Sequence, residues 1–216
     1  MIIYALIPLR TDSIRIKNKN FIKIKKKSVY LYSTHQALQS RLINKVFIAT
    51  NSKKIKIKHK KLSIFKRSKK SDTKKASTEI VVEEFLKNNV CDYLVLIQAP
   101  NLFIKTKYID LAIKKLIKNK KKYDSLLSVV KSTYFIWQRT GDLITSKNYN
   151  FKKRPRSQDI RNNEFIENGS FFIFNRKKFL RLKNRLHGKI TYFEMPKESI
   201  FELDEKEDLH IIKKLI

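Results

Sequence analysis

Short apolar runs that alternate with amphipathic segments are the feature that most limits how this chain folds. The clearest run is 92-DYLVLIQ-98, in which the apolar residues are nearly continuous. A strand with this pattern is buried on both faces of its sheet, as in parallel sheets that helices cover. The alternation therefore predicts an α/β fold with a mostly parallel sheet flanked by helices.

The same patterns predict individual elements. Strands are expected at 2–8, 46–50, 62–65, 92–98, 125–130, 170–174, 190–195 and 199–203. Helices are expected at 30–42, 77–89, 106–119, 176–182 and 205–216, and the basic connection 51–61 is interpreted as a further helix. Periodicity fades at 131–166, which we interpret as an excursion or small subdomain. With only three glycines and four prolines among 216 residues, no linker is visible, so a single domain is expected over 1–216.

The chain is strongly basic, with 50 Lys and Arg against 19 Asp and Glu and a formal charge of +31. Such a charge suits an anionic partner such as nucleic acid, a membrane surface or a phosphorylated substrate. Lysine runs occur almost everywhere, however, beside Ile, Asn and Phe. We therefore favour compositional drift over a nucleic-acid surface, because specific binders concentrate charge on one face or motif.

The cysteine count and the N-terminal segment are used to predict the cellular compartment. Cys91 is the single cysteine, which excludes an intrachain disulfide and a multi-cysteine zinc site and suits a reducing compartment. The apolar segment 1-MIIYALIPL-9 has no preceding basic stretch and is too short to span a bilayer. We expect a soluble, cytoplasmic protein that does not bind membranes.

Polar residues that follow strands are the first candidates for chemistry, because ligands of open α/β sheets lie outside the carboxyl ends of the strands. Arg10, Thr50-Asn51-Ser52, Gln98 and Asn101 meet this condition. The loop 10-RTDSIRIKNKN-20 adds cations and hydroxyls that suit phosphates. It contains no glycine, so it is neither a Walker A loop nor a dinucleotide fingerprint, and an ordinary basic loop is the alternative.

Seven separated strings, in order, resemble motifs of the acylneuraminate cytidylyltransferase family, which includes sialic, pseudaminic and legionaminic acid cytidylyltransferases. The first string, IPLRTDSIRIKNKN, resembles IPARxGSKxIxxKN. The others are KSVYLYSTHQALQSRLINKVFIATNS, RSKKSDTKKASTEIVVEEFL, DYLVLIQAPNLF, RPRSQD, ENGSFFIF and SIFELDEKEDL. Asp12, Ile14, Lys74 and Glu202 depart from the family pattern, which has Gly, Lys, Asp and Asp there.

The resemblance implies a Rossmann-like nucleotidyltransferase fold and a site. Nucleotide binding falls to Arg10, Ser13, Lys19, Asn20, Arg67, Ala76 and Thr78, and sugar binding to Gln98, Arg156 and Gln158. Arg10, Lys19 and Asp204 would be catalytic. The excursion at about 131–166 would serve dimerisation, with basic residues reaching the sugar carboxylate, in some members across the subunit interface. The alternatives without a role in binding are a solvated basic loop for Arg10 and Lys19, a helix cap at 76–78, a strand-end amide for Gln98 and a charged surface stretch for Arg156 and Gln158.

Glu202 and Asp204 are expected to bind Mg²⁺. They are separated by one residue at the end of the expected strand 199–203, so both side chains would project to one face. Two like charges held together are costly unless a cation lies between them, and hard oxygen ligands suit Mg²⁺. The alternative for Asp204 is the N-cap of the last helix. Gly169, in a chain with so few glycines, is expected at a backbone position that no side chain can occupy.

The implied reaction joins CTP and a nonulosonic acid, giving a CMP-sugar and pyrophosphate for surface glycan synthesis. The anomeric hydroxyl attacks the α-phosphorus in line, and no side chain is an obvious general base. Two alternatives stay open: a degenerate relative that binds nucleotide or sugar without turnover, and a basic nucleic-acid-binding protein.

Overall fold

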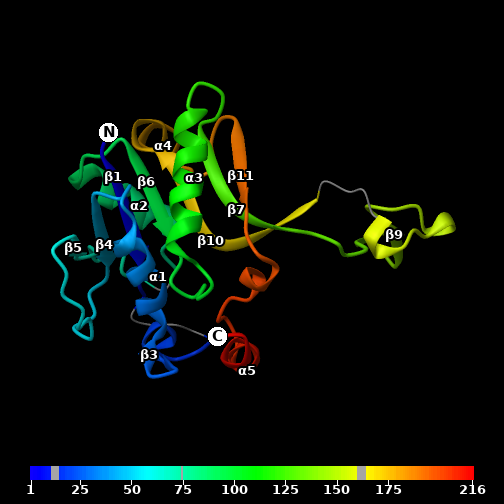
Figure 1. The fold of residues 1–216 in the computed structure, drawn as a ribbon, viewed down its shortest axis with the longest axis horizontal. Helices are drawn as coiled ribbons and strands as arrows, with labels where there is room; N and C mark the ends of the chain where they lie inside the picture. The colour runs from blue at the N-terminus through cyan, green and yellow to red at the C-terminus, as the bar shows by residue number, and fades with distance from the viewer. Residues whose placement is uncertain (11–14, 74, 160–163) are drawn as a thin grey trace.

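A seven-stranded sheet forms the centre of the protein (Figure 1). The computed structural model describes residues 1–10, 15–73, 75–159 and 164–216. The sheet contains β1 (Ile3–Pro8), β4 (Lys45–Ala49), β5 (Leu62–Phe65), β6 (Tyr93–Ile97), β7 (Ser125–Lys131), β10 (Phe165–Asn175) and β11 (Ile190–Glu194), in the order β11-β7-β10-β6-β1-β4-β5. Only β10 runs antiparallel to its described neighbours, β6 and β7. The predicted mostly parallel α/β sheet is confirmed.

Helices cover both faces of this sheet. They are α1 (Val29–Gln39), α2 (Thr78–Asn88), α3 (Thr106–Lys118), α4 (Arg176–Leu182) and α5 (Lys206–Leu215). Helices α1 and α3 pack on one face, α2 and α4 on the other, and α5 lies below the sheet (Figure 1). None of the described helices combines the length and apolar character that crossing a bilayer requires.

Strand β6 shows why the longest apolar run is continuous. Val95 and Ile97 face the core under α1 and α3, whereas Leu94 and Leu96 face the core under α2 and α4. All four side chains are fully buried. Successive strand residues point to opposite faces, so a central strand between two helical layers needs apolar residues at every position.

The excursion is an arm, described over residues 132–159 and at residue 164, that extends away from the sheet between β7 and β10 (Figure 1). Its described elements are the hairpin of β8 (Trp137–Thr140) and β9 (Leu143–Ser146) and the 3₁₀ turns η2 (Phe151–Lys153) and η3 (Ser157–Asp159). Aromatic rings of Phe135, Trp137, Tyr149 and Phe151 pack together, and the Arg154 guanidinium lies 3.9 Å from the Phe135 ring centre.

Two predicted elements are wrong. The segment 51–61 is not helical: Ile55 and Ile57 both pack on the core, while Lys54, Lys56 and Lys58 beside them are exposed. That period of two requires extended backbone, and a helix would also crowd like charges. The segment 199–203 is not a strand. The 3₁₀ turn η4 (Lys197–Ile200) precedes irregular backbone, and the Leu203 N–H donates to the carbonyl of Pro100 instead of joining a sheet ladder.

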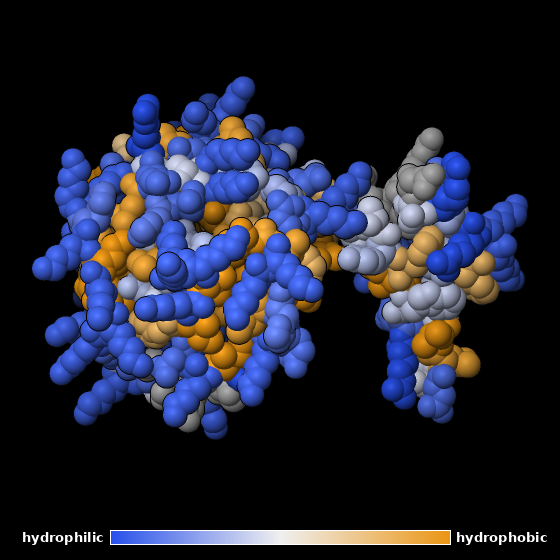
Figure 2. Space-filling model, turned by 60° about the horizontal axis from the view of Figure 1, so that its bottom comes forward, coloured by the Kyte–Doolittle hydropathy of each residue, from blue (hydrophilic) through white to orange (hydrophobic). Residues whose placement is uncertain are grey.

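Hydrophilic side chains spread over the whole face in Figure 2, with apolar ones between them, and do not gather into one stripe.

We expect Phe85→Ala to destabilise the protein by about 3–5 kcal/mol, because it removes a fully buried ring that packs edge-on against Phe47 and Phe65. Denaturant unfolding measures the change. The matched control is Leu111→Ala on α3, where the residue is 52% exposed and the effect should stay within about 0.5 kcal/mol. Equal losses in the two variants would contradict this packing.

Candidate active site

A cavity of about 280 Å³ opens at the carboxyl ends of β1 and β6. It is lined by Pro8, Arg10, Arg15, Ile16, Lys19, Asn20, Arg67, Thr78, Val81, Gln98, Pro100 and Asp204. Most residues predicted to bind nucleotide or sugar are therefore brought together from segments far apart in the chain. Ser13, Asp12, Ile14 and Lys74 lie outside the described residues.

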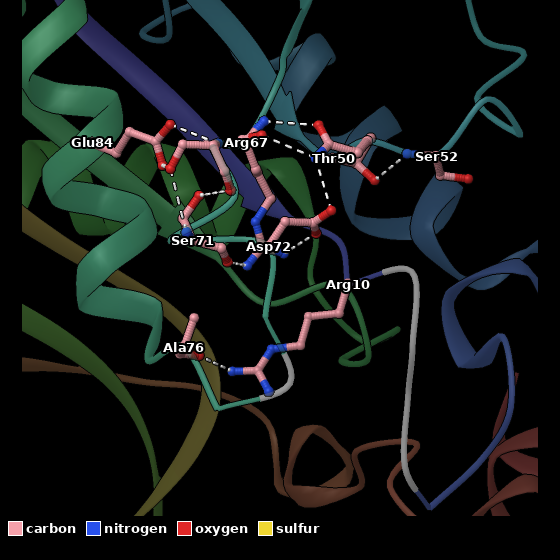
Figure 3. Close-up of polar contacts among 10 residues, drawn as sticks. Arg10, Thr50, Ser52, Arg67, Ser71, Asp72, Ala76 and Glu84 are labelled. Atoms are coloured by element: carbon pink, nitrogen blue, oxygen red, sulfur yellow. Dashed lines mark hydrogen bonds and ion pairs between the residues drawn. The ribbon is translucent and has the colours of Figure 1, made fainter.

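Arg10 and Arg67 reach the loop before α2 from two directions (Figure 3). Arg10 follows β1 and donates from Nη2 to the carbonyl of Ala76 at 2.6 Å. The Arg67 side chain is 1% exposed, donates to the carbonyl of Ser71, and lies 3.7 Å from Asp72. Burial lowers the pKa of Arg67, although Asp72 opposes the shift. The loop therefore holds two guanidinium groups at the cavity wall.

Asn51 fixes the backbone of Arg67, a role that sequence reasoning missed. Its amide oxygen accepts from the Arg67 N–H at 2.9 Å, and its amide nitrogen donates to the Arg67 carbonyl at 2.9 Å. The same nitrogen donates to Asp72 at 2.8 Å. The only signal in the sequence was the position of Asn51 directly after a strand.

Asp204 joins the C-terminal part of the chain to the basic loop. Its carboxylate accepts from Lys19 Nζ at 2.7 Å and from Arg15 Nη2 at 2.8 Å. Burial acts to raise the pKa of Asp204, but the hydrogen bonds and charges of Lys19 and Arg15 hold it below its ordinary value. Asp204 is therefore ionised in the neutral range.

Glu202 is held differently, in a cramped and poorly solvated place. Burial raises its pKa to about 7, and the charge of Asp204 adds to the shift. Its Oε1 atom is buried without a hydrogen-bond partner among the described residues. Gly169, at φ +59°, packs against this carboxylate so closely that a Cβ would overlap it. The expectation that no side chain fits at Gly169 is confirmed.

Two expectations for the acidic pair are wrong. Because 199–203 is not a strand, Glu202 and Asp204 do not share a strand face, although both border a second cavity that adjoins the first at Asp204. Asp204 does not cap the last helix either. Glu205 is the N-cap of α5 and forms a capping box with Asp208, since the Asp204 carboxylate is bound by Lys19 and Arg15.

The acidic pair nevertheless fits a Mg²⁺ ion. No group of three or more metal-ligating side chains gathers in the described part of the chain. Mg²⁺ is usually bound by one or two carboxylates together with substrate phosphates and water, so Glu202 and Asp204 are a sufficient set. The unpaired buried oxygen of Glu202 is the atom that such a cation would satisfy.

The predicted sugar-binding residues are split. Gln98 lines the cavity, whereas Arg156 and Gln158 lie in the arm, which extends away from it (Figure 1). Arg156 is exposed and bonded to Asp159 at 2.6 Å. Within one chain the structure therefore does not bring these two residues to the site.

Fold and site together define an α/β protein with a cationic cleft at the carboxyl edge of its sheet. A family model described as cytidylyltransferase matches residues 4–216. The chain therefore belongs to the cytidylyltransferase family, as the motif resemblance implied.

Individual members of the family are similar to this chain. N-acylneuraminate cytidylyltransferase A of Danio rerio is 30% identical over 94% of this chain, which spans 48% of that protein. Pseudaminic acid cytidylyltransferase of Campylobacter jejuni is 24% identical over 97% of this chain, which spans 94% of it. The chain thus spans about half the length of the first of these relatives. The crystal structure of 4-diphosphocytidyl-2C-methyl-D-erythritol synthase from Anaerococcus prevotii has a TM-score of 0.69 at 11% identity, covering 99% of this chain and 95% of that one.

We expect Gly169→Ala to destabilise the protein more than Gly141→Ala does. Both glycines have positive φ, so each substitution costs about 1 kcal/mol of backbone strain. Only at Gly169 does the new methyl group also meet Glu202, which adds about 1–3 kcal/mol. Thermal unfolding measures both variants, and Glu202→Ala in the Gly169→Ala background should recover the added loss. Equal losses at the two glycines would contradict the contact.

We expect the free energy of unfolding to fall as the pH rises from 4.5 to 7 in the presence of a chelator. Folded Glu202 titrates at about 7 instead of 4.5, so in this window the native state binds more protons than the unfolded state. The loss amounts to at most about 3 kcal/mol. Glu202→Gln should flatten the profile there, whereas the contribution of Asp204, whose pKa is lowered, is lost only below its ordinary value of 3.8. If Glu202→Gln left the pH dependence of the unfolding free energy unchanged, Glu202 would not be the group that causes the fall.

Proposed function

We propose that the chain is a CTP-dependent enzyme that activates a nonulosonic acid, releasing pyrophosphate and a CMP-sugar for surface glycan synthesis. The observation that supports this most is that three of the five buried polar atoms without a hydrogen-bond partner among the described residues belong to residues that border the two adjoining cavities: Asn20 Oδ1, Arg67 Nε and Glu202 Oε1. Buried polar groups are almost always hydrogen-bonded, so unpaired ones in a cleft indicate a bound ligand.

The triphosphate is assigned to the cationic end of the cavity. Arg10 and Lys19 lie there, and Ser13 belongs to the same loop by sequence. In the reaction, the anomeric oxygen of the sugar bonds to the α-phosphorus, the bond between the α-phosphorus and its bridging oxygen breaks, and the hydroxyl proton is released. Fixed cations beside the departing pyrophosphate stabilise the charge that develops on it.

The cytosine is assigned to the wall formed by Arg67, Ala76 and Thr78. Arg67 offers a buried Nε–H that has no acceptor among the described residues, and Asn51 holds its backbone in place. Thr78 is the first residue of α2 and lines the same cavity. Asn20 completes the nucleotide set with an amide oxygen that no donor in the described part of the chain reaches. Directional groups of this kind suit a base, which is recognised through hydrogen bonds at its edge.

Sugar binding is assigned to Gln98 in the cavity and to Arg156 and Gln158 from a second subunit. In this proposal the protein is a homodimer, residues 1–216 form one catalytic domain, and the arm is its dimerisation element. The arm's exposed apolar side chains support this, since Trp137 is 42% and Phe151 55% exposed. An arm that leaves its own body can place its basic residues in the partner's cleft.

Glu202 and Asp204 are the proposed Mg²⁺ ligands. When bound, the ion neutralises phosphate charge as a Lewis acid. Lys19 and Arg15 bind the Asp204 carboxylate, so the two cations that would meet the phosphates lie beside a proposed metal ligand. The proposal places the protein in the cytoplasm, where the single buried Cys91, whose pKa burial raises to about 12, stays an unreactive thiol.

Pyrophosphate release from CTP with Mg²⁺, across a panel of nonulosonic acids, tests the proposal, with mass detection of the CMP-sugar. We expect release with one acid, and a loss of at least about a hundredfold in Asp204→Ala. Arg181→Ala, an exposed residue of α4, is the control and should retain activity. CTP binding with no product from any acid would indicate a relative without turnover. Binding of arbitrary RNA with a steep salt dependence and no CTP preference would indicate a nucleic-acid-binding protein.

A further inference from the structure

Asn101 is a buried side chain whose contacts have no part in the function described so far. It lies in the loop after β6 and is fully buried. Its amide nitrogen donates to the carbonyls of Ser199, at 2.7 Å, and Asn168, at 3.2 Å, and its oxygen accepts from the Phe103 N–H at 3.2 Å. One amide therefore joins the loop after β6, strand β10 and the turn η4.

The acidic segment, residues 201–205, has no regular structure to fix its place. It lies between η4 and α5, and no described strand pairs with it. Its attachment at the start is the Asn101 bond to Ser199, which Asn168 reinforces by donating to Ser199 Oγ at 2.8 Å. In the middle, the Leu203 N–H donates to the Pro100 carbonyl at 3.1 Å. The neighbours Pro100 and Asn101 thus hold this segment at two points.

The position of the carboxylates is demanding. Glu202 must fit against the backbone of Gly169, and Asp204 must reach Lys19 at 2.7 Å. Both contacts are close, so a displaced segment would lengthen the bond to Lys19 or press Glu202 against the Gly169 backbone. Groups that orient ligand carboxylates through such contacts typically change metal affinity or activity by 10- to 100-fold when removed.

We propose that Asn101 is the positioning residue that sets Glu202 and Asp204 in the geometry needed to take a divalent cation. The inference rests on one part of the proposed function, the assignment of these two carboxylates as ligands of the metal ion. Asn101 also ties the acidic segment to Gln98, because its own N–H donates to the Gln98 carbonyl at 3.4 Å. The metal end and the sugar end of the site therefore share one loop.

The test compares Asn101→Ala and Asn101→Leu with Asn119→Ala. Asn119 makes the same kind of bond, donating to the Lys115 carbonyl at 2.8 Å, but at the far end of α3. Asn101→Leu keeps a branched side chain in the site, adds no charge and loses both donors, so it addresses a folding failure of the smaller variant. The probe is Mn²⁺, measured by electron paramagnetic resonance with the folded full chain and CTP, together with hydrogen exchange of residues 199–205.

We expect both Asn101 variants to bind Mn²⁺ at least about tenfold more weakly. Amide exchange should rise in 199–205 and not in α1 or α3, while CTP binding without metal stays unchanged. Asn119→Ala should resemble the wild type in every readout. Wild-type Mn²⁺ affinity in a folded Asn101 variant, or faster exchange throughout the protein, would overturn the positioning role. Failure of pyrophosphate release by the wild-type chain would instead overturn the proposed function, because the exchange experiment does not require turnover.

Discussion

The contact between Asp204 and the two cations Lys19 and Arg15 is the interaction on which the site depends. It joins residues near the two ends of the chain, 185 and 189 positions apart, across the carboxyl edge of the sheet. Without it, the ion pairing described between the basic loop and the acidic segment would be reduced to Arg15 and Glu205, whose charged atoms are 4.0 Å apart. Exposed ion pairs contribute little to stability, but this one is partly buried and lines a cavity, so it acts mainly on the geometry of the site.

Other parts of the site are held in place by hydrogen bonds from buried polar side chains. Asn51 holds the backbone of Arg67, and Asn101 holds the turn before the acidic segment. Both asparagines follow central strands and lie where loops need partners for backbone groups that no helix or strand satisfies. Three of the five buried polar atoms that lack a partner among the described residues, on Asn20, Arg67 and Glu202, belong to residues that border the two cavities. These are the groups to which a ligand could bring hydrogen bonds.

Much of the fold followed from periodicity, and the failures have a physical cause. Strand β6 was predicted because both of its faces are apolar, and α2 because Ser77 caps it and Glu79 lies in its first turn. The segments 51–61 and 199–203 failed because short runs of alternating residues suit a strand, a loop or a helix, and the choice depends on neighbours. In the segment 199–203, the Leu203 N–H donates to the Pro100 carbonyl and not to the edge of a strand. Even Lys25 and Lys26 adopt positive φ in a hairpin turn, where propensity favours glycine.

The sequence by itself determined the α/β class, the order of most elements and, through motif resemblance, the family, and it predicted several of the residues that line the cavity. Those follow from local pattern and register, which a single chain displays. Only the tertiary structure decided that Glu202 is buried against Gly169 with a raised pKa, that Asp204 pairs with the basic loop, that Glu205 caps α5, and that Arg156 lies on an arm away from its own cleft. Burial and charge pairing depend on which distant segments come together, and one-dimensional spacing does not encode that distance.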